Sequence, residues 1–246
     1  MGKKIEICCF TAESAIIAEN VGADRIELCE NYFEGGTTPS YGSIKTVLEK
    51  LIIPVNVIIR PRGGDFFYSD TEFDIIKQDV KAVKQLGANG IVIGFLKNDG
   101  NIDVEKTKEI IELAKPMEIT FHRAFDRCKN PFVAIEQLIE LGINRVLTSG
   151  QKQTAYAGVD LISQLVKQAG DRIVVMPGSG VNDKNINELI EKTNAKEFHS
   201  SAKIFIPSKM GYSDKIVSMG SNSVDENNII SVDVNMIKNM KQSILI

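Results

Sequence analysis

The chain has 246 residues, 43% of them hydrophobic and 25% charged, which is the balance of an ordinary globular protein with a sizeable core. Its net charge of -3 gives no general attraction to nucleic acids or anionic membranes, so we expect neither as a partner. The opening residues MGKKIEICCF lack the apolar core of a signal peptide, and no segment reaches the roughly 18 apolar residues of a membrane span. We therefore expect a cytoplasmic protein whose four cysteines are free thiols.

Short β-branched runs alternate with amphipathic segments from residue 5 to about residue 202, a rhythm typical of repeated βα units. Strands are predicted at 5–10, 25–30, 54–61, 90–96, 118–125, 145–150, 172–177 and 197–202. Helices are predicted between them at 11–21, 41–51, 71–86, 103–114, 131–141, 159–169 and 183–192. Eight strands without an internal linker predict an α/β fold, a single (β/α)8 or TIM-like barrel, rather than a doubly wound sheet.

Glycines mark several predicted helix ends, and the rhythm breaks after the eighth strand. The segments VGADRI, LGANGI and LGINRV each place a glycine just past a helix and a strand directly after it, as a left-handed C-cap requires. Later residues favour loops without a clean period, until a closing helix at 234–246. We therefore predict a barrel domain at 1–206 and a C-terminal extension at 207–246, which packs on the barrel or on a neighbouring subunit.

Alternate residues of each barrel strand point inward, and many of them are polar here. The side chains predicted to face the interior are Glu6, Cys8, Glu27, Cys29, Asn56, Ile58, Arg60, Thr120, His122, Glu197 and His199. A barrel built only for stability would hold branched apolar residues there, because a buried ion costs several kcal/mol unless it is paired. One interpretation is a closed ionic network that pairs Arg60 with Glu6 or Glu27. The other is a site for a polar small molecule at the mouth of the barrel.

The segment ITFHRAFD contains His122, one of only two histidines in the chain. This residue comes late on an inward-facing strand, where barrel enzymes place their acids and bases. An imidazole titrates near neutral pH, so we predict His122 as the acid or base of a candidate catalytic site. Glu27 and Asp126 are predicted to orient or assist it.

Three loops at the same rim carry groups that suit an anionic ligand. The loop IRPRGGDFFYSD supplies Arg60 and Arg62, which either bind an anion or bridge carboxylates of their own loop. The loop MPGSGVND contains Gly178 and Gly180 and is similar to the phosphate loop of many barrels. The segment LTSGQ adds the hydroxyl of Ser149 without a nucleophile elbow, so a serine hydrolase is not expected. These five residues form the predicted anion site.

Seven segments together resemble one known family. GADRIELC, EGGTTPS, IRPRGGDF, TFHRAFD, LTSGQ, MPGSGV and FHSSA occur in the order and spacing of the CutC copper homeostasis family, over residues 5 to about 220. The resemblance implies a TIM barrel, a cytoplasmic location, a homo-oligomer, and Cu(I) binding through Cys8 in EICC and Cys29 in IELC. The soft Cu(I) ion accepts two thiolates, and neighbouring strands about 4.8 Å apart bring facing sulfurs within reach of one ion.

Two functions from different classes follow. The first is a cytosolic protein that binds Cu(I) through Cys8 and Cys29 and buffers or delivers the ion. The second is an enzyme acting on a small anionic or phosphorylated metabolite, with a site centred on His122. The sequence contains no recognisable nucleophile, Schiff-base lysine or cofactor motif for the second function, so it indicates no reaction class.

Overall fold

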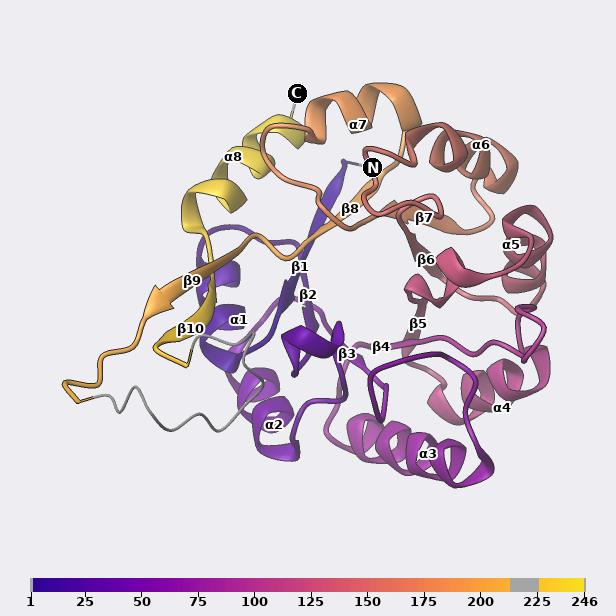
Figure 1. Ribbon diagram of the computed structural model, residues 1–246, viewed down its shortest axis with the longest axis horizontal. Coiled ribbons are helices and arrows are strands. Elements are labelled where there is room, and N and C mark those ends of the chain that lie inside the picture. Colours follow the sequence, from indigo (N-terminus) through magenta and orange to yellow (C-terminus); the bar gives the residue numbers. More distant parts are fainter. Residues whose placement is uncertain (1, 213–225, 246) are drawn as a thin grey trace.

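The structure is a computed structural model that describes residues 2–212 and 226–245. Its barrel strands are β1 (Lys4–Cys9), β2 (Arg25–Leu28), β3 (Val55–Ile58), β4 (Gly90–Ile93), β5 (Glu118–Phe121), β6 (Arg145–Thr148), β7 (Val174–Pro177) and β8 (Glu197–Ser200). Within the described residues these eight parallel strands form one sheet in the order β7-β6-β5-β4-β3-β2-β1-β8. The edge strands β7 and β8 adjoin, so the sheet curls into a nearly closed barrel (Figure 1). The predicted (β/α)8 barrel is confirmed.

Helices form a ring around this barrel (Figure 1). They are α1 (Ala12–Asn20), α2 (Tyr41–Lys50), α3 (Asp70–Gln85), α4 (Val104–Ala114), α5 (Pro131–Glu140), α6 (Val159–Ala169), α7 (Ile186–Thr193) and α8 (Val234–Ile244). A capping box begins α3, where Ser69 and Glu72 bind N–H groups that the helix itself leaves free. Gly22, Gly87 and Gly142 adopt positive φ angles just after α1, α3 and α5, as predicted for left-handed caps.

The main hydrophobic core lies between the sheet and the helices. Outward-facing strand residues such as Ile5, Ile7, Ile26 and Leu28 are fully buried there. Each such side chain contributes about 1.5–3 kcal/mol through its burial. Because these strands turn their apolar side chains towards the helices, their polar side chains occupy the interior of the barrel.

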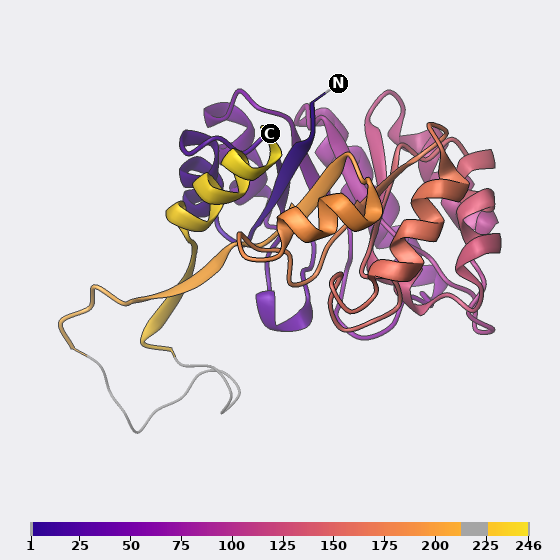
Figure 2. The same cartoon turned by 90° about the horizontal axis from the view of Figure 1, so that it is seen from above.

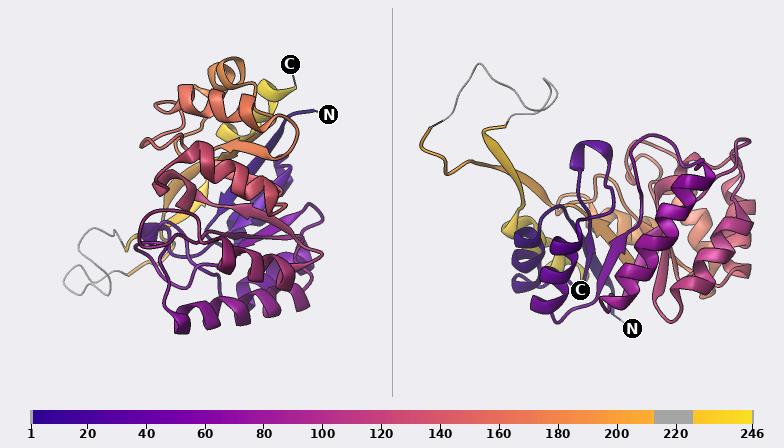
Figure 3. Two further views of the ribbon diagram at one scale, coloured as in Figure 1. Left: turned by 90° about the vertical axis from the view of Figure 1, so that its right-hand side faces the viewer. Right: turned by 90° about the horizontal axis from the view of Figure 1, so that it is seen from below.

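The chain beyond β8 first forms a two-stranded ribbon. Its strands, β9 (Lys203–Pro207) and β10 (Asn228–Val232), pair antiparallel, and the ribbon projects away from the barrel (Figures 2 and 3). Residues 213–225 and residue 246, which belong to the predicted C-terminal extension, lie outside the described part of the chain. Among the described helices, none is both long and apolar enough to cross a lipid bilayer.

Helix α8 lies in the ring between α7 and α1 (Figure 1). Its apolar face buries Ile237, Met240 and Ile244. On its polar side, Lys241 Nζ lies 2.6 Å from Oδ2 of Asp24, which immediately precedes β2. The predicted closing helix therefore packs on the barrel of its own chain.

Most strands end earlier than predicted. A strand was expected over 118–125, but β5 ends at Phe121 and a 3-10 helix, η2 (Arg123–Arg127), follows. His122 forms the corner between them, because its Nδ1 accepts a hydrogen bond from the backbone N–H of Ala124 at 3.1 Å. Buried apolar residues, Ala124 and Phe125, continue past the last paired residue, which explains the overestimate. The residues beyond the strand ends belong to the loops around the mouth of the barrel.

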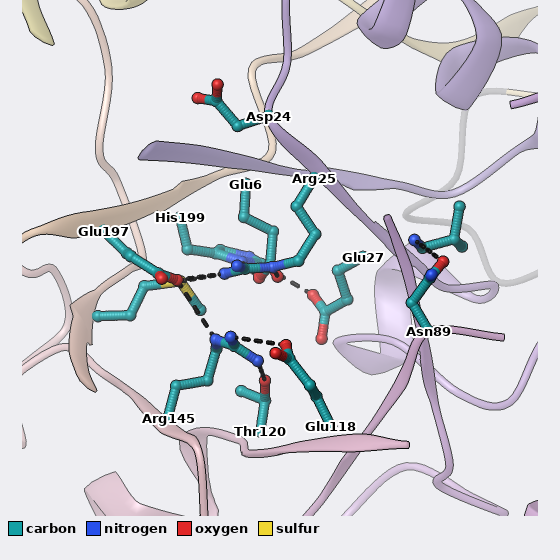
Figure 4. A network of polar contacts seen from close by, with 12 residues as sticks. Glu6, Asp24, Arg25, Glu27, Asn89, Glu118, Thr120, Arg145, Glu197 and His199 are labelled. Carbon is teal, nitrogen blue, oxygen red and sulfur yellow. Dashed lines mark hydrogen bonds and ion pairs between the residues drawn. The ribbon is translucent and has the colours of Figure 1, made fainter. Parts of the chain in front are cut away.

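Charged side chains fill the N-terminal end of the barrel interior and form a closed ionic network (Figure 4). Arg25 pairs with Glu6 and also with Glu197, whose Oε2 lies 2.6 Å from its Nη2. Arg145 contacts Glu197 as well, and its Nη2 lies 2.8 Å from Oε2 of Glu118. All but Glu6 are the first residues of their strands, and Glu6 stands opposite Arg25 in the β1–β2 register. Both guanidinium groups therefore lie among carboxylates, as buried ions require.

The ionic network differs from the first of the two interpretations of the polar interior. That interpretation paired Arg60 with Glu6 or Glu27, but the guanidinium beside Glu6 belongs to Arg25. Arg60 follows the C-terminal end of β3, and its side chain donates hydrogen bonds to backbone carbonyl groups of the rim. Strand parity predicts which side of the sheet a residue faces, but it does not predict its level along the barrel axis.

Candidate functional site

A cavity of about 360 Å³ lies at the C-terminal ends of the barrel strands, a volume suited to a small molecule. Seven of the ten predicted site residues line it: Cys8, Glu27, Cys29, Arg60, His122, Asp126 and Gly180. The other three, Arg62, Ser149 and Gly178, are not part of the lining. His199, Phe66 and Arg127 line the cavity as well, although none of them was among the predicted site residues.

Two buried thiols meet in the wall of the cavity. Cys8 belongs to β1 and Cys29 directly follows β2, and their Sγ atoms are 3.5 Å apart. The two residues are only 6% and 2% exposed. In the parallel β1–β2 pairing Cys8 stands opposite Glu27, and the next inward-facing position after Glu27 is Cys29. The predicted inward orientation therefore brings both sulfur atoms to the cavity.

His199 and Glu27 extend the pair of thiols into a cluster of metal-binding side chains. The ligand atoms of Cys8, Glu27 and His199 all lie within 4.8 Å of one another. His199 Nε2 is 3.5 Å from Glu27 Oε2, while its Nδ1 is 2.8 Å from Glu6 Oε1 (Figure 4). Soft and borderline metal ions favour sulfur and imidazole ligands. We call the set of Cys8, Glu27, Cys29 and His199 the thiol cluster.

The thiol cluster has strongly shifted ionisation. A hydrogen bond with Cys29 lowers the pKa of Cys8 to about 6, against the effect of burial, and His199 supports this shift. Burial raises the pKa of Cys29 and of Glu27 well above their usual ranges. Burial would lower the pKa of His199, but hydrogen bonding to Cys8 and the charges of Glu27 and Glu6 raise it well above its usual value. Together these shifts favour a Cys8 thiolate beside a protonated imidazole.

His199 is the main residue that sequence reasoning did not assign to the metal site. Its inward orientation was predicted, and it is the second of only two histidines in the chain. The barrel closes by pairing β1 with β8, which brings His199 opposite Glu6 across 193 residues of sequence. The sequence signal that could have identified it is its inward position on β8, the strand that pairs with the strand of Cys8.

A separate part of the cavity wall carries His122 and Arg60. The Nδ1 of His122 accepts a hydrogen bond from Ala124, and its Nε2 has no partner among the described residues. Burial, assisted by the charge of Arg60, lowers the pKa of His122 to about 3, so the imidazole is neutral. Within the described chain no hydrogen bond joins His122 to Glu27 or Asp126. The predicted catalytic residues thus share one cavity without forming one hydrogen-bonded group.

Asp126 anchors the loop that follows β6. It accepts hydrogen bonds from Oγ1 of Thr148 at 2.5 Å and from both the backbone N–H and the hydroxyl of Ser149. Arg123 pairs with it at 2.8 Å. Charge-assisted hydrogen bonds of this kind are about twice as strong as neutral ones, so the carboxylate fixes the shape of the rim. Ser149, which was predicted as an anion ligand, is buried in this anchor.

Arg62 and Gly178 support the rim from outside the cavity lining. Arg62 pairs with Glu72 and with Asp65, so it bridges carboxylates of its own loop and the following helix. This is the alternative role that the sequence left open for the arginine pair. A Cβ atom on Gly178 would lie 2.4 Å from Cδ1 of Leu147, so the glycine allows close packing at this position.

Comparison with known proteins agrees with the resemblance found in the sequence. The model of the CutC family matches residues 3–204. A CutC family protein of Parabacteroides distasonis is 51% identical over 225 residues, which cover 91% of this chain and 93% of the relative. A copper homeostasis protein cutC homolog of Homo sapiens is 45% identical over 240 residues, which cover 97% of this chain and 88% of the relative.

Solved structures of other proteins share this fold. CutC from Streptococcus agalactiae superimposes with a TM-score of 0.77 at 32% identity, covering 81% of this chain and 98% of that chain. Phosphoribosylanthranilate isomerase from Thermotoga maritima has a TM-score of 0.58 at 13% identity, covering 99% and 98%, a likeness that concerns the barrel alone. The family match and these identities lead to one conclusion: the chain belongs to the CutC family.

Proposed function

We propose that the protein is a cytoplasmic Cu(I)-binding protein of copper homeostasis and that Cys8 and Cys29 hold the ion. The observation that carries this proposal is the meeting of two buried sulfur atoms, 3.5 Å apart, in the wall of a cavity. Cu(I) is a soft ion that favours thiolate ligands over oxygen and nitrogen. The human relative, a copper homeostasis protein cutC homolog, supports a relation to the same metal.

The remaining members of the thiol cluster support the same assignment. His199 offers an imidazole nitrogen next to Cys8, and its Nδ1 is held by Glu6 at 2.8 Å, which fixes the ring. Ligand imidazoles commonly depend on such a partner for their orientation. Glu27 adds a carboxyl group whose pKa is raised by burial, and the positive charge of a bound cation would favour its ionised form. Sulfur from two cysteines and nitrogen from one histidine therefore form a ligand set suited to Cu(I).

Binding of the ion requires proton release. The lowered pKa of Cys8 favours its thiolate, whereas burial raises the pKa of Cys29 and favours its protonated form. A cation that binds both sulfur atoms displaces the Cys29 proton, and binding by the imidazole also displaces the Nε2 proton of His199, because metal ligands must be deprotonated. The affinity for Cu(I) is therefore expected to rise with pH until neither Cys29 nor His199 has a proton to lose.

The test is an anaerobic competition titration, in which the protein removes Cu(I) from a coloured chelator. We expect the wild type to bind one ion per chain. Replacing Cys8→Ser together with Cys29→Ser should weaken binding by about a hundredfold or more, since both soft ligands are lost. Circular dichroism of each variant checks that the barrel remains folded.

The matched control is the other pair of buried thiols. Cys9 and Cys128 are also free and buried, but neither lines the cavity. The Cys9→Ser, Cys128→Ser variant should therefore keep the affinity of the wild type. Equal loss of Cu(I) in both double variants, or wild-type binding as weak as that of the Cys8→Ser, Cys29→Ser protein, would contradict the proposal.

A further inference from the structure

Arg60 carries a buried charge that no carboxylate of the described residues neutralises. The residue is 5% exposed. Its Nη1 donates to the backbone carbonyls of Glu34 and Gly36, at 2.6 and 2.8 Å, and its Nη2 donates to that of Gly64 at 3.1 Å. These bonds use three of the five N–H groups of a guanidinium, and Nε has no partner in the described chain. An unpaired buried ion costs several kcal/mol, a cost that an incoming anion would offset.

His122 supplies a second unused donor in the same cavity wall. The residue is 4% exposed, and its Nδ1 accepts the N–H of Ala124, so the ring proton resides on Nε2. That Nε2 has no partner among the described residues. A Cβ atom on Gly94 would lie only 2.4 Å from the imidazole, so the absence of a side chain there makes room for the ring. The ring is held in place by its other nitrogen, while this buried N–H has no partner in the described chain.

The ring of Phe66 connects the two donors. The Cζ atom of Arg60 lies 5.2 Å from the Phe66 ring centroid, and the ring centroids of Phe66 and His122 are 4.9 Å apart. All three residues line the cavity, together with the exposed side chain of Arg127. An apolar ring flanked by two free N–H donors and a further positive charge is suited to an anion with a small carbon body.

We propose that Arg60 and His122 form a second binding site in the cavity, for a small organic anion that carries a phosphate or carboxylate group. Its oxygen atoms accept hydrogen bonds from Nε–H of Arg60 and from Nε2–H of His122, and its body packs on Phe66. This site is separate from the thiol cluster and does not depend on Cu(I) binding there. It would hold the class of substrate that the enzyme hypothesis requires, with His122 as a hydrogen-bond donor.

The test is a nitrogen NMR titration of the imidazole groups, which are few because the chain has only two histidines. The probes are phosphoglycolate, inorganic phosphate and malonate, each compared with sodium chloride at equal ionic strength. We expect a saturable shift of the His122 Nε2 resonance with phosphoglycolate. A response to phosphate alone or to malonate alone would support a phosphate or a carboxylate ligand, respectively. No saturable shift with any of the three probes would overturn the proposal.

Variants show whether the named donors bind the probe. Arg60→Met should weaken binding by about tenfold or more, as the loss of a charged hydrogen-bond donor predicts. If that variant does not fold, Arg60→Lys should show the same loss, because lysine lacks the Nε–H group. Arg172→Met, which alters an exposed arginine paired with Glu136 outside the cavity, should change the affinity by less than about twofold. Unchanged binding in both Arg60 variants would overturn the assignment.

The cysteine variant separates this site from the copper site. Because Arg60 and His122 do not belong to the thiol cluster, the Cys8→Ser, Cys29→Ser protein should bind the probe within about twofold of the wild type. Failure of Cu(I) binding would therefore leave the anion result intact, and the reverse also holds. Loss of probe binding in the folded cysteine variant would instead assign the anion to the thiol cluster and overturn the proposed second site.

Discussion

The two ends of the barrel interior contain the same kinds of charged residue in different arrangements. At the N-terminal end, Arg25 lies between Glu6 and Glu197, and Arg145 also contacts two carboxylates. At the C-terminal end, Arg60 donates to backbone carbonyls, forms no ion pair among the described residues, and has an Nε–H without a partner there. The first arrangement is complete within the chain, whereas the second has donors that remain to be satisfied.

Because of this difference, we expect the N-terminal end of the barrel interior to contribute to stability and the C-terminal end to bind ligands. Ions that partner one another inside the protein stabilise the fold once it has formed, and breaking one partner is costly. Donors and thiols without such partners lower the stability of the free protein, and a ligand can recover that free energy. Glu6 lies at the boundary, since one carboxylate oxygen contacts Arg25 and the other contacts His199 of the thiol cluster.

The largest expected effect is on folding stability. Arg25→Met leaves two buried carboxylates without their shared partner, so we expect the free energy of unfolding to fall by about 3–5 kcal/mol. Arg60→Met removes hydrogen bonds to carbonyls but no ion pair, and we expect a smaller loss of about 1–2 kcal/mol. Urea unfolding at neutral pH measures both values. A stability loss for Arg60→Met that equals or exceeds the loss for Arg25→Met would contradict the claim that the ion pairs of the N-terminal end contribute more to stability.

The second largest effect is expected in the pH dependence of the free energy of unfolding, through the ionic network around Glu6. Despite burial, the charge of Arg25, helped by His199, lowers the pKa of Glu6 from 4.5 to about 2. Because the folded pKa is the lower one, this stabilisation is present above pH 4.5 and is lost as the pH falls towards 2. The expected size is on the order of 3 kcal/mol.

Urea unfolding over this pH window, on wild type and on Glu6→Gln, measures the contribution of Glu6. The variant lacks the titrating carboxylate, so it should be less stable at neutral pH and should lose less stability on acidification. Identical pH profiles for the two proteins would mean that the network does not hold Glu6 ionised. Glu6 would then not belong to the ionic network of the N-terminal end.

The smallest expected effect concerns the ionisation of a single thiol at the C-terminal end of the barrel interior. The hydrogen bond with Cys29, supported by His199, lowers the pKa of Cys8 to about 6. The ultraviolet absorbance of thiolate in the metal-free protein should therefore show one transition with a midpoint of about 6. Cys8→Ser should remove it, and His199→Asn should raise its midpoint. The same transition in the Cys8→Ser protein would show that another cysteine ionises.

Much of the fold could be predicted because its signals are local. The alternation of β-branched runs with amphipathic segments predicted eight βα units, and the parity of each strand predicted the inward orientation of Cys8, Cys29 and His122. The position of each residue along the barrel axis depends on the register between strands, which is not local. The sequence therefore could not distinguish Arg25 from Arg60 as the partner of Glu6.

The candidate site was predicted in part for the same reason. Arg60 and Arg62 are two residues apart, yet only Arg60 lines the cavity, because Arg62 turns towards Glu72 at the start of α3. His199 joins the thiol cluster only because the barrel closes between β1 and β8. Contacts between residues so far apart in the sequence could not be predicted from local patterns of one amino-acid sequence.

The most direct test of the account is X-ray absorption at the copper edge, recorded on the protein loaded anaerobically with one equivalent of Cu(I). We expect two sulfur ligands in the wild type and in the Cys9→Ser, Cys128→Ser control. We expect both to be lost when Cys8→Ser and Cys29→Ser are combined. A wild-type spectrum without sulfur ligands, or one that the combined cysteine variant reproduces, would contradict the claim that the C-terminal end of the barrel binds copper through its thiols.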